Sequence, residues 1–226
     1  MDKLRIEKEV RKLHKEIWDQ QDTLWPQGCH SLLDMLNPMA ACQLLGIDYQ
    51  EYPEIDNRFL KGGVRHRIAG LLDRQAQKIA ICSSFSLEEV RFTAAHEIGH
   101  LILHPHHVMH RDRPLDGGFR QSDPYEREAD YFAACFLMPK KSLWLQFQQR
   151  FLTIPFHFDD VSSYQIDPHE YNALLLADAG SLDRAFALAR CESYNGQAFY
   201  SLAKQFKVSK TAMARRIQEL GFIQWP

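Results

Sequence analysis

Hydrophobic residues near the N-terminus recur every three or four positions, which is the period of an α-helix. Ile6, Val10, Leu13 and Ile17 fall on one face of an otherwise charged segment. This spacing predicts an amphipathic helix that ends at about Trp18. We expect this face to dock on the body of the protein, and an independent partner-binding helix is the alternative.

The next segments contain signals for a second helix and for two strands. Asn37 and Pro38 are typical of a helix start, and Gly46 of the position just past a helix end. Residues 67–72 and 78–82 are short apolar runs separated by polar residues, which predicts two strands joined by a turn. An exposed strand edge could pair with an extended peptide, but the sequence does not show which strand is the edge.

A longer helix is predicted after these strands. Ser86 and Glu89 have the spacing of a capping box, so we expect a helix over residues 87–103. Its apolar stripe consists of Val90, Ala94, Ile98, Leu101 and Ile102. His96 and His100 project from roughly the opposite side of this helix.

His96, Glu97 and His100 form an H-E-x-x-H pattern. A step of four residues returns to the same helix face, so both imidazoles can reach one metal ion. The pattern alone is common by chance, but its place on a capped amphipathic helix supports a metal site. A hydrolytic zinc site needs a third protein ligand and keeps one position open.

Glu126 is the best candidate for the third ligand. It belongs to a second predicted helix, which Pro139 stops. The buried stripe of this helix consists of Ala129, Phe132, Ala133, Phe136 and Leu137. Glu126 and Asp130 lie on or beside the stripe, whereas Glu128 is predicted to point away into solvent. Acidic groups aimed at a core are costly without a positive partner, and a metal would be one. Asp130 could then accept the free ring N–H of a ligand histidine.

A competing ligand set uses His106, which follows His96 by ten residues as in metzincins. Leu103 takes the position of the metzincin glycine and disfavours the required turn. His104 continues the face of the two motif histidines and could support the site from behind. Pro105 ends the helix.

Two stretches also resemble a known family. They are RFTAAHEIGHLILHP at residues 91–105 and EREADYFA at residues 126–133, followed by Leu-Met-Pro at 137–139. Over roughly residues 60 to 140, the chain resembles the ImmA/IrrE family of bacterial and phage metallo-endopeptidases. Members usually carry Asn at the position of Asp130, and either residue supplies a hydrogen-bond acceptor.

The resemblance implies a gluzincin-like zinc peptidase with His96, His100 and Glu126 as ligands and Glu97 as the catalytic base. It also implies cleavage of a helix-turn-helix repressor, which releases the repressed genes. We therefore expect a zinc-dependent endopeptidase, with manganese as another possible metal. Glu97 would take a proton from water and pass it to the leaving amine.

Two other functions fit the same sequence. One is a DNA-binding or repressor-binding regulator in which the metal site is structural, although such a site would not need Glu97. The other is a toxin-like protease that acts on a different cellular protein. The sequence identifies neither the scissile bond nor the activating signal.

Residues 202–221 resemble a helix-turn-helix, in which Ser209 caps the second helix. Five basic residues against one acidic residue give this stretch a charge of +4. Lys210, Arg215 and Arg216 are candidate DNA contacts. The alternative is that this helical pair only packs on the rest of the protein.

Composition is compatible with an intracellular enzyme. The chain has 226 residues, of which 45% are hydrophobic and 25% charged, and its net charge of −2 argues against a surface that coats nucleic acid. Its five cysteines are far apart and odd in number, which argues against a disulfide framework. Because no apolar leader or membrane-spanning run is seen, we expect a cytoplasmic protein.

The predicted fold class is α+β. We expect a zincin-like core with a small sheet and the active-site helix, plus a C-terminal helix-turn-helix-like element. The predicted domains are a helical region packed on the core at residues 1–60, the metallopeptidase domain at 61–194 and the C-terminal element at 195–226.

Overall fold

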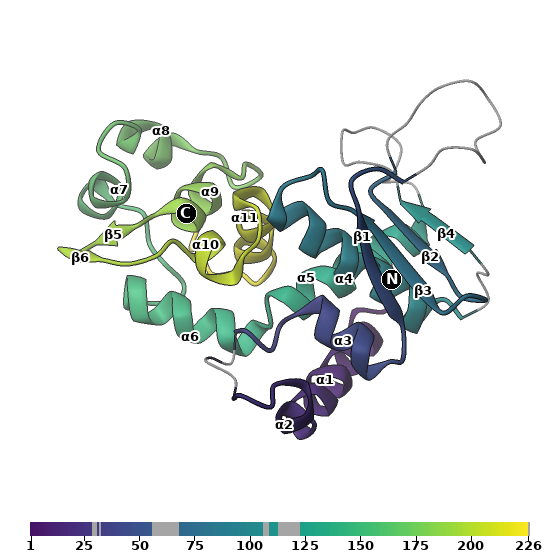
Figure 1. Cartoon of the computed structure of the whole chain (residues 1–226). Coiled ribbons are helices and arrows are strands. Elements are labelled where there is room, and N and C mark those ends of the chain that lie inside the picture. The colour runs from purple at the N-terminus through teal and green to yellow at the C-terminus, as the bar shows by residue number, and fades with distance from the viewer. Residues whose placement is uncertain (29–30, 32, 56–67, 106–108, 113–122, 226) are drawn as a thin grey trace. The chain divides into compact units, whose positions relative to one another are not determined.

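The computed structural model describes residues 1–28, 31, 33–55, 68–105, 109–112 and 123–225. The chain forms two compact units, Met1–Leu137 and Met138–Pro226 (Figure 1). Helices and small sheets together confirm the α+β class. The division between the units lies away from the predicted boundaries after residues 60 and 194, and the three-domain organisation stays a prediction.

Two of the three described N-terminal helices of the first unit, α1 and α3, were predicted from the sequence. Helix α1 (Lys3–Asp19) buries the four residues of its apolar face, which are Ile6, Val10, Leu13 and Ile17. The short α2 (Gln21–Leu24) follows it. Helix α3 (Pro38–Leu44) begins where the Asn37 side chain accepts a hydrogen bond from the Met39 amide. Gly46 follows its end with a φ of 68°, a conformation that favours glycine.

A four-stranded sheet lies in the same unit, with β1 (Asp48–Tyr52), β2 (Gly70–Asp73), β3 (Lys78–Cys82) and β4 (Met109–Asp112). The strand order is β1-β3-β2-β4 (Figure 1). Strands β2 and β3 are the two predicted strands, and they pair in antiparallel, although β2 begins only at Gly70 and Arg67 lies outside the described residues. Strand β1 pairs with β3 in parallel, and β4 pairs with β2 in antiparallel. In the described part of the chain, β1 and β4 are therefore the outer strands.

Helix α4 (Leu87–Leu103) begins with the predicted capping box, in which both the Ser86 and the Glu89 side chains bond backbone amides. It contacts β2, β3 and helix α5 (Pro124–Leu137). We expected burial on one stripe, but His96 and His100 on the other side are buried as well. The reason is that α5 covers the side of α4 that the sheet does not.

The contact between α4 and α5 depends on the absence of a side chain at Gly99. A Cβ placed there would lie 3.1 Å from the Ala129 Cα, 3.1 Å from the Phe132 Cβ and 3.2 Å from the Ala129 carbonyl oxygen. Two of these three neighbours are backbone atoms, which cannot rotate away. A larger residue at position 99 would therefore require the two helices to move apart by a few tenths of an ångström.

Helix α1 is tied to α5 by polar contacts as well as by its apolar face. The His14 Nε2 lies 3.0 Å from the Phe136 carbonyl oxygen, so this nitrogen carries the proton and donates. Its ring stacks on that of Phe136. The Tyr131 hydroxyl donates to the Glu7 carboxylate at 2.7 Å. Burial lowers the pKa of His14 to about 4, against a smaller opposing effect of the carbonyl.

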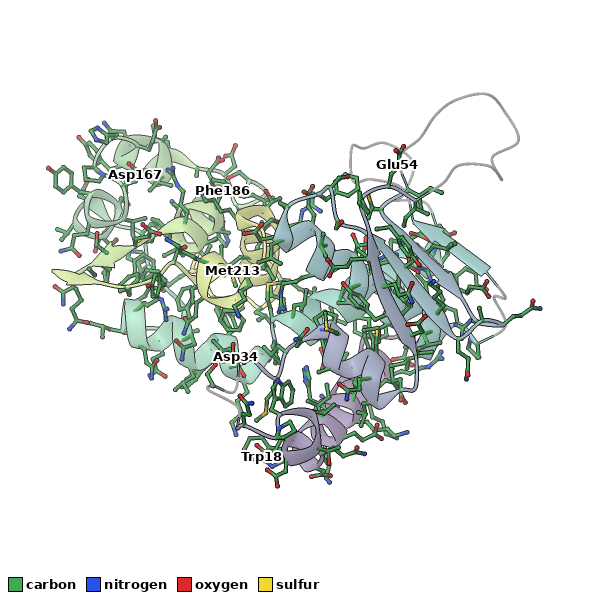
Figure 2. All side chains as sticks on the ribbon, viewed as in Figure 1. Trp18, Asp34, Glu54, Asp167, Phe186 and Met213 are labelled. Atoms are coloured by element: carbon green, nitrogen blue, oxygen red, sulfur yellow. The ribbon has the colours of Figure 1, made fainter. Side chains whose placement is uncertain are left out.

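The second unit is mainly helical. Its elements are α6 (Lys140–Phe151), α7 (Asp160–Ile166), α8 (Tyr171–Leu176), α9 (Asp183–Arg190), β5 (Ser193–Tyr194), β6 (Gln197–Ala198), α10 (Leu202–Phe206) and α11 (Lys210–Glu219). Met213 of α11 is fully buried in it (Figure 2). Helices α7, α8 and α9 are short, with 7, 6 and 8 residues.

Gly99→Ala tests the close approach of α4 and α5. Overpacking against backbone costs about 1–3 kcal/mol, and alanine recovers about 0.5–1 kcal/mol of helix propensity. We expect the free energy of unfolding to fall by about 1 kcal/mol, as the difference of these two effects. Urea unfolding of the metal-free protein measures it, with Arg127→Ala on the exposed side of α5 as the control. A stabilised Gly99→Ala variant would contradict the argument.

The low pKa of His14 predicts an acid-sensitive contact between α1 and α5. The unfolded chain takes up a proton at His14 below about pH 6.5, but the folded chain does so only near pH 4. This contribution to stability is therefore complete above pH 6.5 and is lost as the pH falls towards 4. The amide of His14→Gln can still donate to the Phe136 carbonyl but takes up no proton. Between pH 7 and 4.5, we expect the free energy of unfolding of this variant to fall by about 2 kcal/mol less than that of the wild type.

Urea midpoints at the two pH values measure this difference, and His169→Gln at an exposed histidine is the matched control. Equal acid sensitivity in the wild type and in His14→Gln would show that His14 is not the group responsible.

Candidate metal centre

Helices α4 and α5 bring three predicted ligands together. His96 and His100 come from α4 and Glu126 from α5, and one ligand atom of each lies within 4.8 Å of the others. The two histidine Nε2 atoms are 2.9 Å apart. Each Nε2 is 3.5 Å from an oxygen of Glu126. Among the described residues, these three side chains form a group that could hold a metal ion.

The spacing of these atoms fits a small metal ion. Ligand atoms at 2.0–2.1 Å from a tetrahedral zinc are separated from one another by about 3.3 Å. The observed separations of 2.9, 3.5 and 3.5 Å lie on both sides of this value. Two imidazole nitrogens and one carboxylate also form a donor set typical of catalytic zinc. The three residues therefore fit a zinc ion without rearrangement of the backbone.

Asp130 lies behind His96. Its Oδ1 is 2.8 Å from the His96 Nδ1, on the side of the ring opposite the shared Nε2 position. His96 is almost fully buried. Burial alone would lower its pKa, but the carboxylates of Asp130 and Glu126 outweigh burial and raise the pKa to about 9. The pocket is therefore strongly suited to positive charge.

Glu128 does not lie where the sequence predicted. We expected a solvated carboxylate, but its Oε2 is 3.2 Å from the Nε2 of His104. The Nδ1 of His104 is in turn 3.0 Å from the Nδ1 of His100. The prediction for Glu128 was wrong because the helical pattern of α5 alone does not include His104, which lies just past the end of α4. His104 itself takes the supporting position that its spacing from His96 and His100 favoured.

Glu97 is completely buried beside these ligands. Strand β2 lies directly against it, because a Cβ on Gly70 would be 2.7 Å from the Glu97 Oε1 and 2.6 Å from the Thr93 Cγ2. Only glycine leaves room for the Glu97 carboxylate in this position. Gly70 is a residue of the site that the sequence reasoning missed, since a single glycine in a strand gives no sign of what approaches it.

Two arginines hold the end of α4 that carries His100. The Arg74 guanidinium, from the turn between β2 and β3, donates to the carbonyls of His100, Leu101 and His104, the last two at 3.0 and 2.9 Å. Arg5 of α1 donates to the Leu103 carbonyl at 3.2 Å. These contacts satisfy carbonyls that a helix end leaves without partners inside the helix, and they place positive charge at the favourable end of the helix dipole.

The competing ligand His106 lies outside the described residues. The described neighbours of the motif histidines are Glu126, Asp130 and His104. The described geometry therefore supports Glu126 as the third ligand.

The candidate DNA contacts in the second unit do not share one environment. Lys210 and Arg215 are exposed on α11. Arg216 is only 3% exposed, and its guanidinium donates to the Met138 carbonyl and to Glu219. The prediction that Arg216 is available to DNA is therefore wrong in this structure. Its side chain connects α11 to the start of the unit.

Other sequence expectations concern thiols and membranes. The described cysteines Cys42, Cys82, Cys135 and Cys191 are free and buried, and Cys29 lies outside the described residues. No helix in the described ranges combines the length and the apolar character that crossing a membrane requires.

Two histidines and a glutamate from packed helices, with a second glutamate beside them, define a candidate metal-dependent hydrolase centre. Residues 52–154 match the Peptidase_M78 family, described as the IrrE N-terminal-like domain. This match confirms the resemblance to the ImmA/IrrE family that the motifs indicated, and the matched residues include His96, His100 and Glu126. The family is one of peptidases, and no curated protein matches the chain.

The geometry predicts that the protein binds one zinc ion and that Glu126→Gln weakens binding. Loss of a direct ligand should exceed the roughly 10–100-fold effect that is usual for an outer hydrogen-bond partner. Competition with a chromogenic chelator measures the affinity, and Glu88→Gln in the first turn of α4 is a carboxylate control. Unchanged affinity in Glu126→Gln would remove this residue from the ligand set.

Proposed function

We propose that the protein is a zinc-dependent endopeptidase of zincin-like fold. The observation that carries the proposal is the convergence of His96, His100 and Glu126 next to a fully buried Glu97, inside a domain of a peptidase family. A purely structural metal site usually has four protein ligands. Three ligands with an acid beside them are the arrangement of a hydrolytic site.

Zinc held by these three residues would polarise the scissile carbonyl and make water more acidic. The protein supplies the proton transfer. Glu97 is the general base: its carboxylate takes a proton from the attacking water and delivers it to the leaving amine. Strand β2 fixes this carboxylate in place, because Gly70 packs directly against it.

The sheet offers a place for an extended peptide. Strand β4 is an outer strand and pairs with β2, the strand that contacts Glu97 through Gly70. Strand β1 is the other outer strand, but β3 separates it from β2. A substrate that adds to the sheet by backbone hydrogen bonds would therefore lie closer to the base along β4 than along β1.

The substrate we propose is a helix-turn-helix transcriptional repressor, whose cleavage would release the repressed genes. The reaction would take place in the cytoplasm. The family resemblance supports this substrate class, and manganese remains an alternative metal. A toxin-like protease with another cellular target would use the same centre.

The regulator hypothesis depends on the C-terminal helices. Ser209 caps α11, as a recognition helix requires, and Lys210 and Arg215 are exposed on it. The burial of Arg216 removes one charge from the surface that DNA would contact. The intact Glu97 also favours an enzyme over a regulator with a structural metal.

Glu97→Gln tests the proposed reaction. The amide preserves shape but cannot accept a proton, so we expect zinc affinity to stay within a few fold and peptide cleavage to fall by about 10²–10⁴-fold. Purified wild type and variant would be mixed with a helix-turn-helix repressor encoded near this gene, with and without chelator, and the products sized by mass spectrometry.

Metal-dependent cleavage at one bond, absent in Glu97→Gln, is the expected result. Full cleavage by the variant would reject Glu97 as the base. Stable binding of the repressor without cleavage by the wild type would favour the regulator hypothesis.

A further inference from the structure

A chain of hydrogen bonds leads from the ligand His100 to the edge of the centre. The Nδ1 of His100 lies 3.0 Å from the Nδ1 of His104, and the Nε2 of His104 lies 3.2 Å from the Oε2 of Glu128. Both rings are buried, and the Glu128 side chain is 20% exposed. The chain therefore runs from a ligand through a buried ring to a carboxylate.

The chemistry of the rings gives this chain one direction. The Nε2 of His100 faces His96 and Glu126, so a metal would take its lone pair and leave the ring proton on Nδ1. That N–H must donate, and the Nδ1 of His104 must accept. His104 then carries its own proton on Nε2, which donates to the Glu128 carboxylate. With protons assigned in this way, each neutral ring has one nitrogen that donates a hydrogen bond and one whose lone pair is used, by the metal in His100 and by a hydrogen bond in His104.

We infer that Glu128 is a positioning residue that fixes the orientation and tautomer of the metal ligand His100 through His104. The inference rests on the proposed function, because it requires a metal at the centre. Without an acceptor at Glu128, His104 could carry its proton on Nδ1 instead. Two N–H groups would then face each other at the buried His100–His104 contact, which is unfavourable. His100 would lose its fixed orientation.

The surroundings of His104 support this role. The Arg74 guanidinium donates to its carbonyl at 2.9 Å, and the Tyr125 ring packs against its imidazole with a centroid distance of 4.9 Å. His104 is therefore held at its backbone and on its ring. Helix α5 supplies a carboxylate behind each ligand histidine, since Asp130 bonds His96 directly and Glu128 reaches His100 through one further ring.

The test compares Glu128→Ala, Glu128→Gln and His104→Leu with the wild type. The readouts are zinc affinity by chelator competition and the visible absorption spectrum of the cobalt-substituted protein, which reports ligand geometry. Glu128→Ala and His104→Leu should each weaken zinc binding by about 10–100-fold, the usual effect of such outer partners, and change the cobalt spectrum. Glu128→Gln should keep most of the affinity, because its amide oxygen still accepts from His104.

Two further comparisons isolate the hydrogen-bond chain. The double variant His104→Leu/Glu128→Ala should bind zinc no more weakly than His104→Leu alone, since both changes break the same chain. Arg127→Ala, on the exposed side of α5 between the two glutamates, should behave as the wild type. Thermal unfolding of the metal-free variants shows that each one is folded.

Unchanged affinity and spectrum in Glu128→Ala would overturn the inference while leaving the zinc site intact. Equal losses in Glu128→Gln and Glu128→Ala would show that only the negative charge acts, and would also overturn it. If the wild type binds zinc no better than Glu126→Gln, the proposed metal centre itself fails, and the inference fails with it.

Discussion

The close approach of α4 and α5 at Gly99 is the constraint on which the centre depends. A single methyl group at position 99 would meet the backbone of Ala129 at 3.1 Å. Because the helices are this close, a carboxylate on α5 can share one small space with two imidazoles on α4. Sheet strands cover the other side of α4 in the same way, where Gly70 admits Glu97. Two glycines thus determine how near the chemical groups lie to one another.

This closeness has an electrostatic cost that the arrangement of charges offsets. Burying imidazoles and carboxylates away from water is unfavourable unless each one finds a partner. Three acids of α5, at positions 126, 128 and 130, face three histidines, of which those at 96 and 100 belong to α4 and the one at 104 follows its end. A divalent metal among the innermost three groups would supply the positive charge that their carboxylate requires. The hydrogen bonds and ion pairs that offset the cost of burying these groups also orient the imidazole rings. The stability of the protein and the geometry of the ligands therefore depend on the same interactions.

Local signals in the sequence predicted much of this architecture, and contacts between distant segments account for what they missed. The capping box at Ser86 and the apolar face of α1 depend only on neighbouring residues, and both formed as expected. The direction of Glu128 depends on His104, which lies 24 residues away. Strand β1 was not predicted because its sequence is polar and it forms a strand by pairing with β3, which is distant in the sequence. Arg216 was taken for a surface residue because its charge is visible in the sequence, whereas its burial is not.

The position of β2 connects the proposed base to the edge where a peptide would bind. Glu97 is fully buried, and its carboxylate lies against Gly70 of β2. Strand β4 pairs with β2 from Gly70 to Asp73, so a peptide that adds to β4 would extend the sheet that holds the base. The same hydrogen-bonded sheet would then both bind an extended substrate and position Glu97. A folded substrate of the proposed peptidase would have to offer a segment able to become extended, so local unfolding of the substrate would contribute to its selection together with sequence.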